Sequence, residues 1–220
     1  MEINPLLITL KTSAVATVIT FFAGIFLAYV VCNMKRGKSP VDAIIMLPLV
    51  LPPTVAGFFL LLVFGKRSAF GQFMLQFDIT FVFTWKAAVI AAAVVALPLM
   101  YRTTRGAFEQ LDPNIISAAR TLGVSESKIF WRIVLPNERA GILAGTVLAF
   151  TRAAGEFGAT IIFAGNVPGV TQTMSTAIYA AVQANDYDMA FKWAILWAIL
   201  LATFSMVFIF AMNAVIKGRH

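Results

Sequence analysis

Five long apolar runs restrict what this chain can fold into. They are rich in Leu, Ile, Val, Phe and Ala, and the chain of 220 residues is 60% hydrophobic and only 12% charged. Each run is close to the roughly 20 residues that a helix needs to cross a bilayer, and the alternating ten-residue segments of a membrane barrel are absent. In lipid every backbone polar group needs a partner within the protein. We therefore expect an all-α integral membrane protein.

The runs predict one domain, 1–220, with five transmembrane helices. The first run lacks a basic start and a clear cleavage site, so we interpret it as a retained span rather than a signal peptide. The second run contains Pro48, Pro52 and Pro53, which cannot all lie in a regular helix, and Pro98 indicates a kink in the third. We place the spans at residues 12–32, 41–64, 81–101, 141–164 and 191–216.

The stretch 101–140 interrupts the apolar pattern and carries six of the seventeen Lys and Arg residues. Asp112 can cap a helix that starts at Pro113, where a missing N–H costs nothing. Gly123 can end that helix in the left-handed conformation. Ser125 can cap a second helix, and we expect Pro136 to lie beyond its end. The stretch therefore predicts two short helices joined by a glycine turn.

Basic residues predict the orientation in the membrane. The turn after span one, the stretch 101–140 and the C-terminal Lys217 and Arg219 carry eleven of the seventeen Lys and Arg residues, and five spans put all three on one side. Positive charge favours the cytoplasmic side. We expect a cytoplasmic C-terminus, an external N-terminus and a cytoplasmic hairpin. The loop 165–188, with a helical part at 171–184, then faces outward, either to meet a partner or to cap the bundle.

Several classes of chemistry find no support in the residues. Cys32 is the only cysteine and His220 the only histidine, which argues against a disulfide and against a cysteine or histidine metal site. We find no catalytic set and no nucleotide-binding motif, so we expect no catalytic residue, metal or cofactor in this chain. The net charge is +7, and the charged residues lie beside the apolar spans. This position favours a topology signal over nucleic-acid binding.

The hairpin resembles the EAA loop of binding-protein-dependent ABC import permeases, whose pattern is Glu-Ala-Ala, three residues, Gly, nine residues, Ile-x-Leu-Pro. The spacing is reproduced in full by Ser117, Ala118, Ala119, Arg120, Gly123, Ile133, Leu135 and Pro136. The resemblance implies a cytoplasmic lever seated in a separate ATPase, with small alanines entering a groove and apolar grip from Ile115, Leu122, Phe130 and Ile133. Ser117 replaces the Glu of the pattern, so Arg120 or Glu126 would have to supply the polar contact.

Further segments are similar to the molybdate and tungstate branch of these permeases. They run from Leu47 to Gly57, from Gly155 to Thr160 and from Ala164 to Asn166. The resemblance implies a type I ABC importer fold in the cytoplasmic membrane of a prokaryote and a second copy of this permease. It also implies an ABC ATPase homodimer that binds ATP and Mg²⁺, and an extracytoplasmic binding protein that delivers molybdate or tungstate. Sulfate is the alternative oxyanion, and a secondary anion carrier is the alternative from another class.

Arg152 and Glu156 are the ionisable pair inside a predicted span, four residues apart on one helix face. Charged groups at this depth normally point into a bundle or a wet cavity. The pair either lines the anion path or joins two states, or it forms a buried structural ion pair. Other candidates for the pathway are the broken segment Pro52, Pro53 and Thr54, and the hydroxyl of Thr160, although a Thr in a span often bonds its own backbone.

Overall fold

The computed structural model describes residues 4–217, with side chains through residue 208 and at 210. Every regular element in this part of the chain is helical. The elements in chain order are α1 (Asn4–Asn33), α2 (Lys38–Val50), α3 (Pro53–Phe64), α4 (Ala69–Leu75), α5 (Trp85–Gln110), α6 (Pro113–Thr121), α7 (Glu126–Ile129), the π-helix η1 (Phe130–Val134), α8 (Leu135–Asn137), α9 (Arg139–Ala154), α10 (Gly158–Phe163), α11 (Met174–Gln183) and α12 (Tyr187–Lys217).

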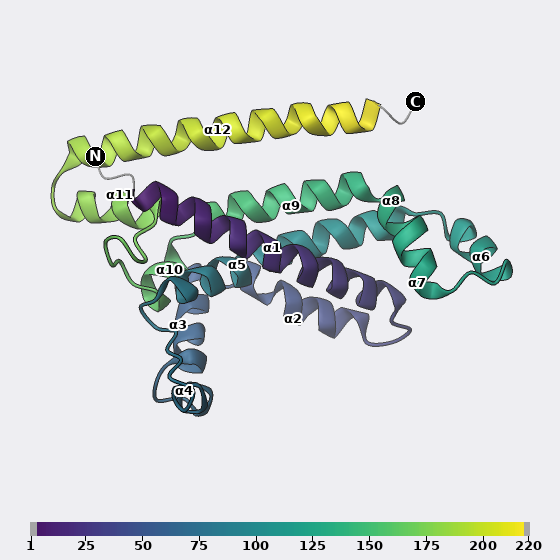
Figure 1. The fold of residues 1–220 in the computed structure, drawn as a ribbon, viewed down its shortest axis with the longest axis horizontal. Coiled ribbons are helices and arrows are strands. Elements are labelled where there is room, and N and C mark those ends of the chain that lie inside the picture. Colours follow the sequence, from purple (N-terminus) through teal and green to yellow (C-terminus); the bar gives the residue numbers. More distant parts are fainter. Residues whose placement is uncertain (1–3, 218–220) are drawn as a thin grey trace.

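A bundle of long helices forms the body of the molecule. α1, α2, α5 and α9 run along its long axis, α6 and α7 lie at one end, and α10 and α11 lie toward the other (Figure 1). α12 runs beside this bundle. α12 begins near the end of the bundle where α1 begins, and it runs toward the end that holds α6 and α7 (Figure 1).

The core forms where α1 packs along α5 and α5 packs along α9. α5 presents small side chains, with Ala88 and Ala96 fully buried. α1 faces it with hydroxyl side chains, and those of Ser13 and Thr17 donate to the carbonyl four residues back at 2.6 Å. Because small residues and satisfied hydroxyls cost little in an apolar environment, the helix backbones approach closely.

Three helices of the described chain, α1, α5 and α12, are each long and apolar enough to cross a membrane. Two bent pairs raise the number to as many as five if each pair counts as one span. One pair is α2 with α3, bent by 109°, and the other is Glu126–Asn137 with α9, bent by 73°. The predicted spans 12–32 and 191–216 lie within α1 and α12.

The proline-rich segment breaks span 41–64 as its composition predicts. α2 ends at Val50 and still contains Pro48, while Pro52 caps α3 and Pro53 is its first residue. α3 turns away from the bundle, so α3 and α4 form a lateral arm (Figure 1). Within this arm, α3 packs on α10. A Cβ on Gly57 would lie 2.7 Å from the Ala159 Cα, so only glycine allows this approach.

The helix boundaries differ from the limits of the predicted spans in two places. The third span was expected to end at residue 101, but α5 starts at Trp85 and continues to Gln110. Arg105 and Glu109 form an i,i+4 ion pair at 2.8 Å in this extension, so its polar residues are compatible with a helix. The fourth span was placed at 141–164, and its helix is interrupted. It stops at Ala154 and restarts as α10 at Gly158.

The loop 165–188 contains a helix close to the predicted position. α11 covers 174–183, within the expected 171–184, and begins with a reciprocal capping box between Thr173 and Thr176. Pro98, where a kink was expected, is buried inside α5, which is assigned as one helix from end to end. The C-terminal Arg219 and His220 and the side chain of Lys217 lie outside the described residues.

Candidate coupling hairpin and intramembrane polar pair

The first helix of the hairpin is fixed at both ends by the residues that predict it. The Asp112 side chain accepts a hydrogen bond from the Asn114 N–H at 2.9 Å, and Pro113 is the first helical residue. Gly123 has a φ of 74°. The N–H of Gly123 donates to the Arg120 carbonyl at 2.9 Å and that of Val124 to the Ala119 carbonyl at 3.1 Å. These two bonds make a complete Schellman motif, so the turn is well defined.

The second helix differs from its prediction in two respects. Ser125 is at the capping position, but its side chain makes no capping hydrogen bond. Pro136 was expected beyond the end of the helix but lies inside α8, so that expectation was wrong. The π-turn η1 precedes it, with the Leu135 N–H bonded to the Phe130 carbonyl. A π-turn changes the helical register and so relieves the clash that a proline ring makes in a regular helix.

Arg120 and Glu126 join the two helices of the hairpin. The Arg120 Nε lies 2.6 Å from Glu126 Oε1, and its Nη2 lies 3.1 Å from Oε2. The bonds from Arg120 hold the pKa of Glu126 below its ordinary value. The stabilisation from a carboxylate with a lowered pKa is present above its unfolded-state pKa and is lost as the pH falls through the folded-state value. Both residues proposed to replace the missing Glu are therefore paired with each other.

The residue at the position of that Glu makes a local contact only. The Ser117 hydroxyl donates to the Pro113 carbonyl at 2.9 Å on the exposed side of α6. Ala118 is exposed as well, whereas Ala119 is buried in the core of this chain. The expected pair of outward alanines is therefore reduced to Ala118, because successive helix residues point in different directions.

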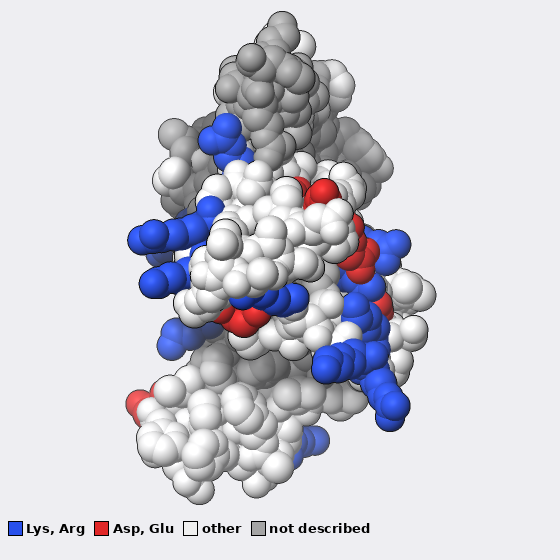
Figure 2. Space-filling model, turned by 90° about the vertical axis from the view of Figure 1, so that its right-hand side faces the viewer, with Lys and Arg blue, Asp and Glu red and all other residues white. Residues whose placement is uncertain are grey.

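The apolar residues of the hairpin divide into two sets. Leu122 is 82% exposed at the turn, and Ile115 is exposed beside it. Phe130, Ile133 and Leu135, in contrast, pack against the core of the bundle, while Pro136 is exposed. Only Leu122 and Ile115 of the four expected grip residues are therefore free for a partner. Lys and Arg side chains gather on both flanks of this end of the molecule, around a mostly uncharged face (Figure 2).

Arg152 and Glu156 form an ion pair at the break between α9 and α10. The Arg152 Nη1 lies 2.7 Å from Glu156 Oε2, outside hydrogen-bond geometry, and the Glu156 side chain is 1% exposed against 25% for Arg152. The other carboxylate oxygen, Oε1, accepts the Ala159 N–H at 2.7 Å. Glu156 therefore balances a charge and also satisfies a backbone donor in the first turn of α10.

The other predicted pathway residues lie close to this pair. A Cβ on Gly158 would lie 2.8 Å from the Pro53 side chain and 3.1 Å from the Thr54 nitrogen, so the starts of α3 and α10 are in contact. Thr54 and Pro52 are exposed. Thr160 is buried with 1% exposure. The broken segment at residues 52–54 and the break between α9 and α10 thus lie together. Both are far from the hairpin along the long axis of the molecule (Figure 1).

One polar cluster was missed from the sequence. Asp42 on α2 accepts a hydrogen bond from the Tyr101 hydroxyl and forms an ion pair with Arg105, both on α5. Arg105 also bonds the Tyr101 hydroxyl at 3.2 Å and pairs with Glu109. The spacing of Tyr101, Arg105 and Glu109 at i, i+4 and i+8 is the only sequence signal for it, because Asp42 lies far away in the chain.

The comparisons with known proteins agree with this arrangement. Residues 20–219 match the family described as binding-protein-dependent transport system inner membrane component. The chain belongs to this family of permeases. It is 42% identical to the molybdenum transport system permease protein ModB of Escherichia coli over 208 residues, 94% of this chain and 91% of ModB. It is 37% identical to the sulfate transport system permease protein CysT of Salmonella typhimurium over 202 residues, 90% of this chain and 73% of CysT.

Solved importer structures share the fold of this permease. The methionine ABC transporter MetNI in an inward-facing conformation superposes with a TM-score of 0.75 at 16% identity, over 98% of this chain and 94% of that one. A bacterial ABC transporter that imports alginate gives 0.80 at 17% identity, over 96% and 79%. The permease therefore has the type I ABC importer fold, and its family is that of inner-membrane transport components.

Proposed function

We propose that this permease carries molybdate or tungstate across the cytoplasmic membrane. The observation that carries the proposal is the 42% identity to ModB over nearly the whole chain. Sulfate is the second candidate, and the lower identity to CysT, at 37%, makes it the weaker one. The polar break where Arg152 and Glu156 meet the start of α3 is the place in the described chain best suited to line the path, because intramembrane charges usually face a wet cavity or a partner.

The hairpin is the part of the permease through which we propose that ATP hydrolysis acts. A separate ABC ATPase homodimer binds ATP and Mg²⁺ and receives the exposed Leu122 and Ala118 in a groove. The Schellman turn and the Arg120–Glu126 pair keep the two helices of the hairpin in one orientation. Movement of the ATPase is therefore transmitted to α5 and α9 as a rigid-body displacement, which is the common basis of two-state transport.

Two copies of the permease and an external binding protein complete the proposed transporter. The lateral arm α3–α4 and the exposed face of α2 offer apolar surface to lipid or to the second copy. The binding protein delivers the anion on the side of α11. We place the selectivity in that protein, because a tight dianion site needs several donors and the pathway residues supply Arg152 as their cation.

The anion and the coupling can be tested together. We expect the ATPase activity of the purified complex to rise when binding protein loaded with molybdate or tungstate is added, and to rise much less with sulfate. Deleting residues 112–136 should remove the ATPase from the purified complex. A secondary carrier, in contrast, would have no ATPase to lose. If the ATPase activity responds only to sulfate, the proposed substrate is wrong. If the permease takes up the anion without any associated ATPase, the proposal of an ATP-driven importer is wrong.

The orientation is tested by reporter fusions. We expect a fusion at Ser125 to report the cytoplasm and a fusion at Gly71 to report the outside, because eleven of the seventeen basic residues fall on the side of Ser125. A cytoplasmic signal at Gly71 would reverse the proposed topology.

A further inference from the structure

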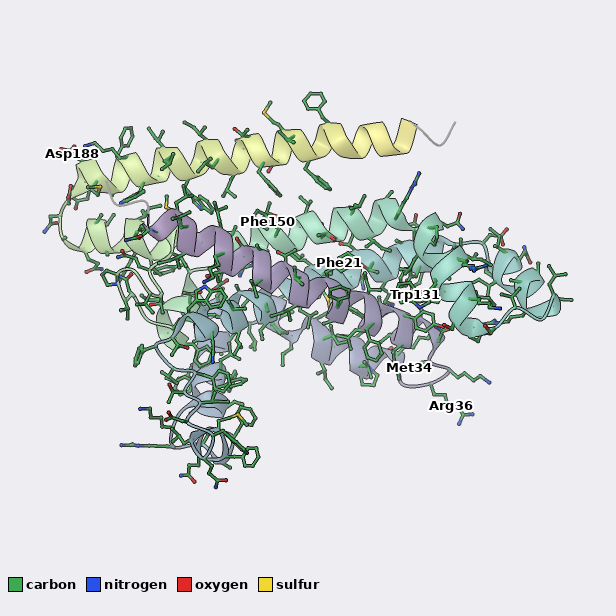
Figure 3. All side chains as sticks on the ribbon, viewed as in Figure 1. Phe21, Met34, Arg36, Trp131, Phe150 and Asp188 are labelled. Carbon is green, nitrogen blue, oxygen red and sulfur yellow. The ribbon has the colours of Figure 1, made fainter. Side chains whose placement is uncertain are left out.

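An apolar groove lies between the hairpin and the first span. Its volume is about 540 Å³, and it is formed by one side of α1 and by α7 with η1. Trp131 and Phe21, on either side of it, are marked in Figure 3. The residues used in the argument are Phe22, Phe26, Tyr29, Ser127, Phe130 and Trp131.

The wall of the groove on α1 is a surface that meets lipid. Phe22 and Phe26 are 67% and 65% exposed, and they lie on a helix apolar enough to cross the membrane. The opposite wall is aromatic. Phe130 packs on Tyr29 with ring centroids 4.5 Å apart, and Trp131 packs on Phe130 at 5.3 Å while staying 65% exposed. An exposed Trp at the edge of an apolar span is typical of the membrane interface.

Two basic residues of the hairpin are next in sequence to residues that line the groove. Lys128 follows Ser127 and Arg132 follows Trp131 in the sequence, and the two cations lie four residues apart, about one turn, on the hairpin. Both are exposed. Within the described part of the chain neither makes an ion pair or a hydrogen bond, because the nearby Glu126 is held by Arg120. Within the described residues, the apolar groove and two cations without an ion pair therefore occur on the same short segment of the hairpin.

We propose that this groove binds an anionic phospholipid. One acyl chain lies along Phe22, Phe26 and Tyr29, and the headgroup phosphate lies between Lys128 and Arg132. Basic residues near a membrane surface favour anionic lipids by an amount that corresponds to roughly fivefold for each one. The bound lipid then bridges span one and the hairpin. The inference rests on the proposed cytoplasmic position of the hairpin, beside the inner end of span one.

Fluorescence of Trp131 tests the site. The complex is placed in nanodiscs that contain a phospholipid with brominated acyl chains, on either a phosphatidylglycerol or a phosphatidylcholine headgroup at the same low mole fraction. The contribution of Trp131 is the difference between the natural complex and Trp131→Phe. We expect half-maximal quenching at a roughly 25-fold lower mole fraction of the phosphatidylglycerol, because each of the two basic residues contributes about fivefold.

The matched variants separate the outcomes. Lys128→Gln with Arg132→Gln should make the two lipids equal, whereas Lys66→Gln with Arg67→Gln, on the arm at the other side, should leave the preference intact. Equal quenching by the two lipids in the natural complex would mean that the groove contacts lipid without preferring an anionic headgroup. No quenching by either lipid would mean that protein covers the groove. Either result would overturn the proposal without affecting the uptake and ATPase measurements, which test the proposed function separately.

Discussion

Gly123→Val is expected to reduce anion uptake by on the order of tenfold while the permease still inserts. Gly123 has a φ of 74°, and a β-branched residue in that region costs about 1–3 kcal/mol, where about 1.4 kcal/mol is a tenfold change. The Schellman bonds at Ala119 and Arg120 and the Arg120–Glu126 pair depend on this turn. Uptake and binding-protein-stimulated ATPase activity, measured on the same preparation, report the coupling.

Gly123→Asn is the matched control, because asparagine tolerates the left-handed conformation much better than valine. A Cβ at this position meets nothing within 4 Å in the permease itself, so backbone strain and contact with the ATPase are the two possible causes of a defect. Asn restores the turn but keeps the Cβ. Normal uptake in both variants would mean that this turn of the hairpin is not needed for coupling. A defect in both variants would mean that the added Cβ disturbs the contact with the ATPase.

Glu156→Ala is expected to have the second large effect, a loss of about 3 kcal/mol of stability, which is the lower end of the range for breaking a buried ion pair. The lower end applies because the Arg152 side chain keeps 25% exposure. The substitution leaves that guanidinium uncompensated and also removes the acceptor of the Ala159 N–H. Thermal unfolding in detergent and the yield of monodisperse protein measure the loss.

Two further variants separate the roles of this carboxylate. Glu156→Gln keeps an oxygen for the Ala159 N–H and loses the charge, so we expect an intermediate loss of stability. The double variant Arg152→Gln with Glu156→Gln removes both charges and should recover most of the stability. If the double variant also retains full uptake, the pair is structural. If it is stable but transports little, the pair acts in the pathway.

The local turn chemistry of this permease was predictable from its sequence. Asp112 caps the helix with its own side chain, and Pro113 and Gly123 act through their own backbone geometry, so each effect is local and the structure places all three as expected. The break at Pro52 was predictable for the same reason, because a proline removes a helical donor wherever it stands.

The sequence-based predictions fail where a contact between residues far apart in the chain, or a change of helix type, determines the structure. Pro136 stays helical because η1 shifts the register before it, and no residue type marks a π-turn in advance. The fourth span breaks at Gly155 because the Glu156 carboxylate supports a new helix start. The inward direction of Ala119 depends on packing against the bundle, and the contact of Asp42 with Arg105 joins two helices that the chain separates widely.

The 109° break between α2 and α3 also bears on how the chain enters the membrane. Each of these helices is about 20 Å long, shorter than the roughly 30 Å of hydrocarbon, so neither can cross alone. α3 packs on α10, whose residues are translated much later. The apolar arm therefore reaches its final place only after α10 has left the ribosome, and until then lipid or the insertion machinery must shield it.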